Sequence, residues 1–489
     1  MQKVSLEKGR IGNLFVRLVI PAVISQLVTL AYNIVDRIYI GHMPEVGRIA
    51  LTGVGVCMPI TIILSAFAQL VGFGGAPKAS AYLGEHRTEA AERTLGSCAL
   101  FSLILSVALM AFTCAFSRQI LILFGASSDT LPYALSYFRI YVCGTAFVEL
   151  SVGLAFFITA QGYTTISMIS VLLGAGLNIL LDPILILGFH MGVAGAATAT
   201  VLSQAVSCVW VLWFLCGKRG MIRLKRKYLC LNWELLLPAL ALGLSPFVQI
   251  LTESLISVCF NRSLLRYGGD AAVGAMTIFS TVMQFVSLPI TGIAQGAQPI
   301  ISYNYGAGQN KRVGECCRLV LKVSLIYSIL FWVILHVSPE MFPRILAEEK
   351  SFIAYSSSMS RYFFAMLWVM GAQISCQLMF VALGNARVSL FLALLRKVFL
   401  LVPLIFLMPH LMSDPVKAVF LAEPVADTLA CATTVTFFMR QYRRNFSVRQ
   451  IERNKNGSRA ISGDDNTEFE KEQRCNFTKY TKENCIGKS

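Results

Sequence analysis

The sequence predicts an all-α membrane protein with twelve transmembrane helices in two six-helix lobes, related by a pseudo-twofold axis along the membrane normal. Three observations support this fold class: the composition, the lengths of the apolar blocks and an internal repeat. Of the 489 residues, 56% are hydrophobic and only 14% are charged, and the mean hydropathy is +0.65. A membrane-spanning helix needs about 20 consecutive apolar residues, and the apolar residues here fall in blocks of that length.

Twelve such blocks follow one another along the chain, and each predicts one span. Their approximate bounds are 14–40, 49–75, 95–117, 132–160, 165–187, 192–215, 235–262, 270–296, 314–337, 357–383, 387–408 and 414–439.

The chain also repeats itself at offsets of 220 to 222 residues. The matching pairs are Gly53 and Gly274, Gly75-Ala76 and Gly296-Ala297, Gly84 and Gly306, Ala160-Gln161-Gly162 and Ala382-Leu383-Gly384, and Pro183 and Pro403. Each half has an even number of spans, so both halves enter the membrane in the same direction. A parallel repeat of this kind predicts a substrate cavity between the halves.

The formal net charge of +16 predicts membrane orientation rather than nucleic-acid binding, because the Lys and Arg residues concentrate in short loops between apolar blocks. The loop 217–234 carries six of them and should be cytoplasmic, which also places both termini in the cytoplasm. The 14 Cys include no metal-like or CxxC spacing, so we assign them no redox or metal role. The first apolar block is too long for a cleavable signal, and a multi-pass plasma-membrane protein is expected.

These observations give four segments. Residues 1–216 form the N-lobe with spans one to six, 217–234 a cytoplasmic basic linker, and 235–440 the C-lobe with spans seven to twelve. Residues 441–489 are polar, of mixed charge and without periodicity, which predicts a disordered cytoplasmic tail.

One polar cluster interrupts the fifth apolar block. Asn178 and Asp182 are four residues apart and share a helix face, and Pro183 follows directly. A charge in the bilayer centre costs roughly 2.5 to 3.5 kcal/mol on insertion scales, so such residues usually face a protein interior or a watery cavity. Pro183 recurs as Pro403 in a half without these acids, so we assign it to helix shape.

Span counting places further polar residues at the same depth. Asn33 and Asp36 near the end of the first span, and Thr200 in the sixth, fall within roughly 6 to 15 Å of the outer helix ends, as do Asn178 and Asp182. Oxygen ligands of this kind suit a monovalent cation, and two neighbouring carboxylates can hold a proton. The alternative is structural: Asp36 could pair with its neighbour Arg37 or cap a helix end, and Asn178 could bridge helix backbones.

The second half lacks this cluster, since Val398 and Val402 stand where the first half has Asn178 and Asp182. It has its own ionisable residues, which are Glu253, Arg396, Lys397, Glu423 and Asp427. We favour an internal ion pair between the eleventh and twelfth spans, with a second coupling site as the alternative. Glu149 and Lys322 have no evident partner, and both snorkelling and lining a cavity remain open.

Polar, aromatic and methionine side chains could line the central cavity, because soft or flat side chains suit varied amphipathic guests. Packing between helices is the competing explanation for each of them. The candidates are Gln26, Tyr32, Gln161, Gln249, Glu253, Met283 and Gln284.

Several motifs resemble those of the multidrug and toxic compound extrusion (MATE) transporters, close to the MepA-type branch. They are Pro21 with Val35-Asp36-Arg37, the run 178–183, the block Gly195–Thr200 and, most specifically, the block Gln295–Gly306. The resemblance covers roughly residues 10 to 440 and implies a twelve-helix, two-lobe exporter of organic cations driven by Na⁺ or H⁺. It also implies that Asp36, Asn178, Asp182 and Thr200 form the amino-lobe cation site and that the first helix bends at Pro21.

The expected function is therefore a secondary-active multidrug efflux antiporter, without cofactor or metal beyond a coupling Na⁺ or H⁺, acting as a monomer on small organic compounds and conferring antibiotic resistance. A lipid-linked oligosaccharide flippase of related fold is the alternative, although it would require a cationic cavity. An intramembrane enzyme is disfavoured, since the five His residues include no pair at ligand spacing. A channel is disfavoured by the two-lobe repeat.

Overall fold

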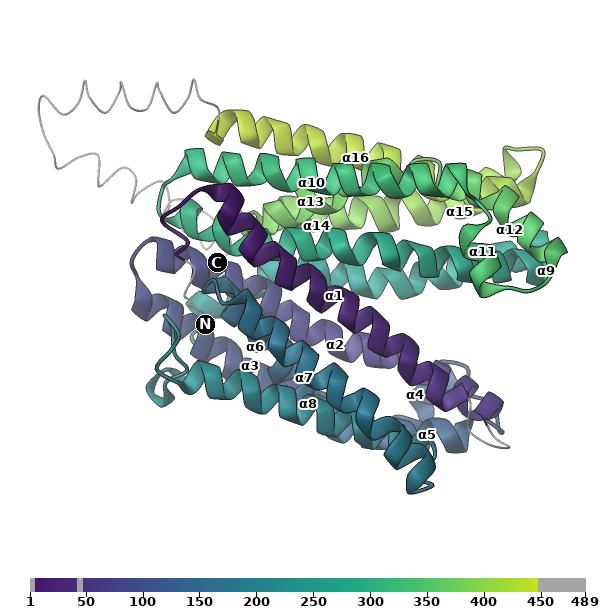
Figure 1. Ribbon diagram of the computed structural model, residues 1–489, viewed down its shortest axis with the longest axis horizontal. Coiled ribbons are helices and arrows are strands. Elements are labelled where there is room, and N and C mark those ends of the chain that lie inside the picture. Colours follow the sequence, from purple (N-terminus) through teal and green to yellow (C-terminus); the bar gives the residue numbers. More distant parts are fainter. Residues whose placement is uncertain (1–4, 42–46, 447–489) are drawn as a thin grey trace, which may run out of the picture. The chain divides into compact units, whose positions relative to one another are not determined.

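The computed structural model describes residues 5–41 and 47–446, and every regular element in these ranges is a helix. Figure 1 shows their arrangement along the chain. The helices of the first half are α1 (Ile11–Gly41), α2 (Gly47–Gly84), α3 (Thr88–Ala115), α4 (Ser117–Leu123), α5 (Leu131–Cys143), α6 (Thr145–Ala160), α7 (Thr164–Pro183), the π-helix η1 (Ile184–Gly188) and α8 (Val193–Cys216). Of the predicted disordered tail 441–489, residues 441–446 are instead the helical end of α16 (Pro415–Phe446), and the remainder lies outside the described residues.

The second half begins with a short 3₁₀ turn in the linker and continues to the end of the described chain. Its helices are η2 (Arg226–Tyr228), α9 (Trp233–Gly306), α10 (Asn310–Val337), α11 (Met341–Leu346), α12 (Lys350–Phe363), η3 (Leu367–Val369), α13 (Met370–Ala382), α14 (Ala386–Leu394), the π-helix η4 (Leu395–Leu401), α15 (Val402–Leu407), η5 (Met408–His410) and α16 (Pro415–Phe446). Residues 5–438 belong to one compact unit, and 439–446 are the described part of a second.

The predicted twelve spans are confirmed, with three differences in detail. Nine helices of the described ranges are long and apolar enough to cross a membrane, and two helix pairs, α5 with α6 and α12 with α13, form bent spans with angles of 54° and 52°. The 74 residues of α9 would extend about 110 Å, too long for one crossing. Since Gly269 interrupts α9 with φ 64°, this helix supplies both the seventh and the eighth span.

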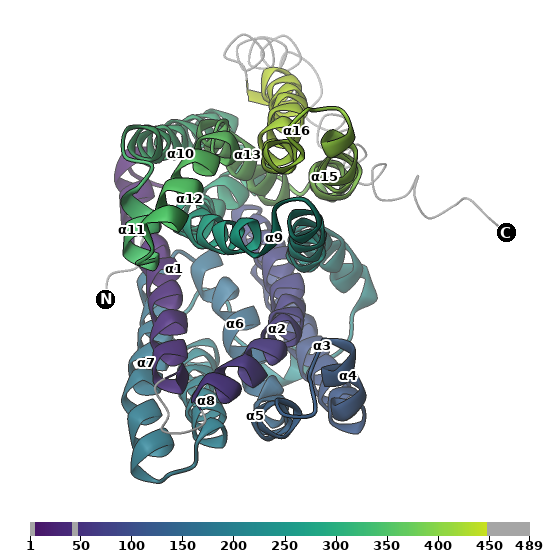
Figure 2. The same cartoon turned by 90° about the vertical axis from the view of Figure 1, so that its right-hand side faces the viewer.

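Each lobe has its own apolar core. In the N-lobe, Phe138, Ile40 and Val142 are fully buried between α1, α2, α5 and α8. In the C-lobe, the ring of Phe279 lies 5.3 Å from that of Phe363 and 5.4 Å from that of Phe420, which joins α9, α12 and α16. Figure 2 shows α9 of the C-lobe and α2 of the N-lobe near the middle of the view.

The sequence repeat is visible as a reciprocal contact between the lobes. A Cβ atom on Gly84 would lie 2.0 Å from the carbonyl oxygen of Tyr303, and one on Gly306 would lie 2.1 Å from that of Ala81. Both pairs of equivalent positions are 222 residues apart in the chain. The two helices therefore meet through the same surface of each half, as a twofold relation requires.

The proline repeat also has a structural counterpart. Pro183 ends α7, and the chain continues as the π-helix η1. In the second half, the π-helix η4 ends directly before Val402 and Pro403. An irregular turn thus adjoins the repeated proline in both halves, after Pro183 in the first and before Pro403 in the second. Because proline removes one backbone donor from the regular ladder, this is in keeping with a role for Pro183 in helix shape.

Polar side chains of the block 295–306 form hydrogen bonds to α13, to α10 and to the start of the chain. Ser302 Oγ donates to the carbonyl oxygen of Ala382 at 2.8 Å. Asn304 Nδ2 donates to the carbonyl oxygen of Leu6 at 3.2 Å, and its Oδ1 accepts from Arg312 Nε at 2.8 Å. The motif that is most specific in the sequence thus has a packing role.

The linker between α8 and α9 is folded against the start of α3. Lys225 Nζ lies 2.6 Å from Glu92 Oε2, and Ser97 Oγ donates to the carbonyl oxygen of Cys230 at 2.8 Å. Tyr228 OH donates to Glu89 at 3.2 Å. The basic linker therefore has a defined structure and joins the halves over the ends of the helices.

A glycine substitution tests the closeness of the helices between the lobes. A Cβ atom on Gly74 of α2 would lie 1.8 Å from the carbonyl oxygen of Ala239 on α9, whereas one on Gly55 of the same helix has open space. Since backbone atoms cannot move aside locally, we expect Gly74→Ala to destabilise the protein by about 1 to 3 kcal/mol. Gly55→Ala should be neutral or slightly stabilising. Thermal unfolding of the two variants in detergent measures the difference, and equal melting temperatures would contradict this packing.

Candidate functional site

The predicted polar cluster of the N-lobe is assembled around one amide. On α7, Asn178 Nδ2 donates to Asp182 Oδ1 at 3.3 Å, one helical turn further on. The same nitrogen lies 3.4 Å from Thr200 Oγ1 on α8, and the Thr200 hydroxyl donates to the carbonyl oxygen of Ala196 at 3.0 Å. Asn178 and Asp182 are 3% and 0% exposed. The amide therefore fixes the carboxylate and the hydroxyl relative to each other.

The first helix adds a second carboxylate. Asp36 of α1 is buried, and its carboxyl group lies in hydrogen-bonding contact with that of Asp182. Two buried carboxylates so close to each other repel when both are ionised, and a shared proton or a bound cation would relieve this repulsion. Asn33, the fifth predicted member, has a side chain outside the described part of the structure.

Buried oxygens on α7 remain available as ligands in this cluster. Asn178 Oδ1 and Asp182 Oδ2 are buried and accept no hydrogen bond from a described residue. A buried acceptor without a partner is costly, which fits a site that receives a proton or an oxygen-seeking cation. Across the described residues there is no group of three or more His, Cys, Asp or Glu that could hold a metal ion. The donor set suits H⁺ or Na⁺ rather than a tightly held transition metal.

Aromatic residues on one side of this cluster were not predicted, except for Tyr32. Tyr32 on α1 lies within electrostatic range of Asp36 and of Tyr141 on α5. Tyr137, one turn before Tyr141, is also near Asp36, and the two rings stack at 6.1 Å. Two tyrosines four residues apart in an apolar span are the sequence signal that could have identified this face.

The C-lobe has an ion-paired network instead of this cluster. Arg396 Nε lies 2.6 Å from Asp427 Oδ1, and Arg396 Nη2 lies 3.4 Å from Glu423 Oε1. All three side chains are buried, so the expected ion pair between the eleventh and twelfth spans is present. Lys397 Nζ lies 2.8 Å from Glu253 Oε2, and the Glu253 side chain is 65% exposed. Among these acids, only Glu253 is open to its surroundings.

Apart from Glu253 and Gln161, the residues proposed for the cavity divide into two groups. Gln26 and Gln249 are half-buried and bond between helices: Gln26 Nε2 donates to Gln295 Oε1 at 2.9 Å, and Gln249 Oε1 accepts from Gln377 Nε2 at 3.3 Å. The three exposed or half-buried members without such a bond between helices are Tyr32, Met283 and Gln284.

Gln161 is the residue whose position differs from the cavity prediction. It is fully buried, its Nε2 donates to the carbonyl oxygen of Phe157 and its Oε1 accepts from the backbone nitrogen of Ile222. Its Oε1 anchors the linker and its Nε2 bonds within α6, so both polar atoms are used in backbone contacts and not in a cavity. A glutamine at a helix end followed by glycine is the pattern of a cap, which the sequence analysis did not weigh.

The helix-bending residue Pro21 lies inside α1, which continues as a helix through it from Ile11 to Gly41. Pro21 is buried, and its carbonyl oxygen accepts a hydrogen bond from Ser25 Oγ at 2.9 Å. The carbonyl of Arg17, four residues earlier, loses its usual backbone donor at this proline. The ladder of α1 is thus weakened between its start and Asp36.

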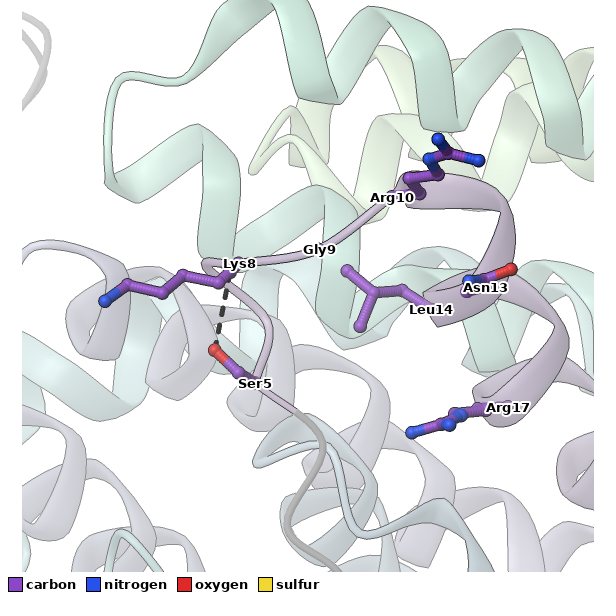
Figure 3. Close-up of a pocket in the computed structure, with 7 residues that line it drawn as sticks. All are labelled: Ser5, Lys8, Gly9, Arg10, Asn13, Leu14 and Arg17. Atoms are coloured by element: carbon purple, nitrogen blue, oxygen red, sulfur yellow. Dashed lines mark hydrogen bonds between the residues drawn. The ribbon is translucent and has the colours of Figure 1, made fainter.

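A separate pocket lies at the start of α1 (Figure 3). It has a volume of about 340 Å³. Its lining residues are Ser5, Lys8, Gly9, Arg10, Asn13, Leu14 and Arg17. In the close-up the Lys8 and Arg10 side chains extend away from each other, and the pocket is more than four helical turns from Asp36. It is therefore no part of the carboxylate cluster.

Twelve spans in two lobes and a buried oxygen cluster in one lobe define a secondary transporter of two-lobe architecture. The chain belongs to the MatE family, whose model matches residues 21–184 and 247–407.

The relatives agree with this membership. The Multidrug export protein MepA of Staphylococcus haemolyticus is 25% identical over 444 residues, which are 90% of this chain and 96% of that protein. A solved structure of the MATE multidrug transporter DinF-BH, described as a complex, is 34% identical, with a TM-score of 0.82 over 91% of this chain and 99% of that one. A MATE family transporter of the MOP superfamily in an outward-facing conformation has a TM-score of 0.83 at 22% identity, over 90% of this chain and 98% of that one, and shows the shared fold.

Proposed function

We propose that the protein is a secondary-active multidrug efflux antiporter, which exports amphipathic and often cationic organic compounds in exchange for H⁺ or Na⁺ through alternating access. Its family membership makes it a transporter and not an enzyme. The MepA relatives are named as multidrug export proteins, which supports export of small-molecule drugs.

The observation that carries the coupling proposal is the contact between Asp36 on α1 and Asp182 on α7. Binding of a proton or Na⁺ removes the repulsion between the two carboxyl groups and lets α1 approach α7. Loss of the ion charges the pair again and separates the helices. A differential affinity of the ion for these two arrangements is what couples its gradient to the conformation.

Pro21 is the residue at which α1 can bend when the ion binds near Asp36. The backbone ladder is already weakened at this residue, so a change near Asp36 can bend the outer part of α1 without unfolding the inner part. Since Gln26 on this helix bonds Gln295 on α9, movement of α1 also changes the surface between the lobes. In this mechanism the cavity shrinks, the drug leaves to the outside and the lobes return to the inward-facing arrangement.

We propose a plasma-membrane location, both termini and the linker in the cytoplasm, and a monomeric unit surrounded by lipid. The concentration of Lys and Arg in the linker supports this orientation. The exposed Glu253 carboxylate, with Tyr32, Met283 and Gln284, is proposed to receive the organic cation in the cavity.

A lipid-linked oligosaccharide flippase is not favoured. Such a protein needs cationic side chains to bind pyrophosphate, whereas the buried basic residues of the C-lobe, Arg396 and Lys397, are paired with carboxylates. The relatives' names likewise point to drug export.

Reconstitution into liposomes tests the function. Uptake of a fluorescent organic cation is followed after imposing a pH gradient, a Na⁺ gradient or neither across the membrane. We expect accumulation against the concentration gradient with one of the two ion gradients. Equal, non-accumulating equilibration under all three conditions would exclude an antiporter and favour a channel or a different substrate.

A further inference from the structure

Glu149 is a buried carboxyl group that the mechanism above does not use. It lies on α6, five residues after Gly144, where span four bends by 54°. Its side chain is 0% exposed, so it neither snorkels nor contacts solvent. It faces the backbone of Ala68 near the middle of α2, about 30 Å from the start of that helix. Glu149 is therefore deeper in the membrane than Asp36, which is five residues from the end of α1.

Glu149 has no hydrogen-bonding side chain and no ion-pair partner among the described residues, and the polar group beside it is the backbone of Ala68. On the side of α5, Tyr141 lies within electrostatic range of Glu149. The polar contact between α6 and α8 is made by another residue of α6, Ser151, whose hydroxyl donates to Gln204 Oε1 at 2.9 Å. An ionised carboxylate without a counter-charge is among the most costly groups to bury in a membrane. The surroundings therefore accommodate the neutral acid, which carries a proton.

One tyrosine lies within electrostatic range of Glu149, and another lies within electrostatic range of Asp36. Tyr141 lies in hydrogen-bonding contact with Ser65 on α2, beside Glu149, and within range of Tyr32 on α1. Tyr32 is in turn near Asp36. Ser65 and Tyr32 are half-buried, whereas Glu149 is fully buried. These polar groups lie between the outer cluster and the middle of the lobe, among side chains that are otherwise apolar.

We infer that Glu149 is a further proton-binding residue of the transport cycle, loaded from the Asp36 and Asp182 pair through the hydroxyls of Tyr32 and Tyr141. This inference rests on the proposed antiport function and makes H⁺ the coupling ion.

The transfer balances at every step. A hydroxyl accepts a proton on its oxygen and releases its own proton to the next oxygen, so Tyr32 and Tyr141 are unchanged and only the two ends of the path exchange a proton. When Glu149 gives up its proton, it becomes an ion in an apolar site, which favours the arrangement that lets water reach α6. The bend at Gly144 and the half-buried Ser65 are where such an opening can occur.

Glu149→Gln tests the inference, because glutamine has nearly the shape of the protonated acid but cannot release a proton. We expect it to fold and insert as the wild type does, and to lose most of the drug uptake driven by a pH gradient in liposomes. A second readout is proton release into a weakly buffered detergent solution when a fluorescent cation, ethidium, is added. We expect Glu149→Gln to release fewer protons than the wild type.

Thr145→Val is the matched control, since Thr145 lies one turn earlier on the same face of α6 and its hydroxyl is also buried without a partner among the described residues. It should leave both readouts unchanged. Tyr141→Phe should slow uptake and leave the number of released protons unchanged. If Glu149→Gln misfolds, Glu149→Asp takes its place, and we then expect the pH profile of uptake to shift.

The outcomes separate this inference from the function on which it rests. Normal uptake and normal proton release by Glu149→Gln, together with loss of both in Asp182→Asn, would overturn the role of Glu149 and keep the antiporter. Absence of gradient-driven uptake by the wild type would refute the function itself. An equal shift of the pH profile in Thr145→Val would show that Glu149 has only a packing role.

Discussion

Asp182→Asn is expected to reduce ion-driven drug transport to the rate of protein-free vesicles while leaving the protein folded in the membrane. Asparagine keeps the side-chain volume and can still accept the hydrogen bond from Asn178, so the local geometry between α7 and α8 is maintained. It cannot be ionised, so the repulsion with Asp36 that depends on ion binding is permanently absent. Transport is measured in liposomes and resistance in cells that express the variant.

The matched control for this prediction is Asp270→Asn. Asp270 lies just after the interruption of α9, is exposed and has the same side chain. This variant should transport normally, which separates loss of the coupling group from any general effect of an Asp-to-Asn exchange. Asp36→Asn should behave as Asp182→Asn does. Normal efflux by either cluster variant, at wild-type abundance in the membrane, would remove the carboxyl pair from the mechanism.

Arg396→Met is expected to destabilise the C-lobe by about 3 to 5 kcal/mol, because it leaves two buried carboxylates without their shared cation. Methionine fills a similar length and retains the apolar contacts, so the effect isolates the charge. Asp427 at 2.6 Å and Glu423 at 3.4 Å both lose their partner. The melting temperature in detergent and the yield of inserted protein measure the loss, which should occur whether or not the protein transports.

Two further variants show whether the network itself is responsible. Lys322→Met removes a cation on α10 that belongs to no ion pair of the described chain, and it should be nearly neutral. Arg396→Met combined with Glu423→Gln and Asp427→Asn removes all three charges and should regain much of the lost stability. If the triple variant is less stable than the single one, the network contributes by geometry and not by charge compensation.

The membrane class and the number of spans could be predicted because apolar block length is a local property of the chain. The repeat could be predicted because glycines and prolines recur at a nearly constant offset. In the structure, Gly84 contacts the helix that carries Gly306, and Gly306 contacts the helix that carries Gly84. The bends at Gly144 and after Phe363 could not, since a bent span and a straight one have the same hydropathy.

The polar cluster, too, could be predicted from the sequence only in part. Asn178 and Asp182 could be assigned to one face from their spacing, and depth placed Asp36 and Thr200 near them. Only the fold shows that the Asn178 amide joins Asp182 and Thr200. Gln161 was assigned to the cavity from its residue type alone, and the structure places both its polar atoms in backbone contacts.

The sequence by itself determined the class of protein, the twelve spans, the two equivalent halves and the confinement of the Asn178 and Asp182 cluster to the first. These follow from the hydrophobic effect and from helix periodicity, which act on residues close in the chain. The tertiary structure decided which groups separated by many residues meet: Asp36 with Asp182, Arg396 with Asp427, and Glu149 with the tyrosine path but with no counter-charge among the described residues. Such contacts depend on how helices pack, because rotation of one helix by a fraction of a turn turns a buried partner into a lipid-facing side chain.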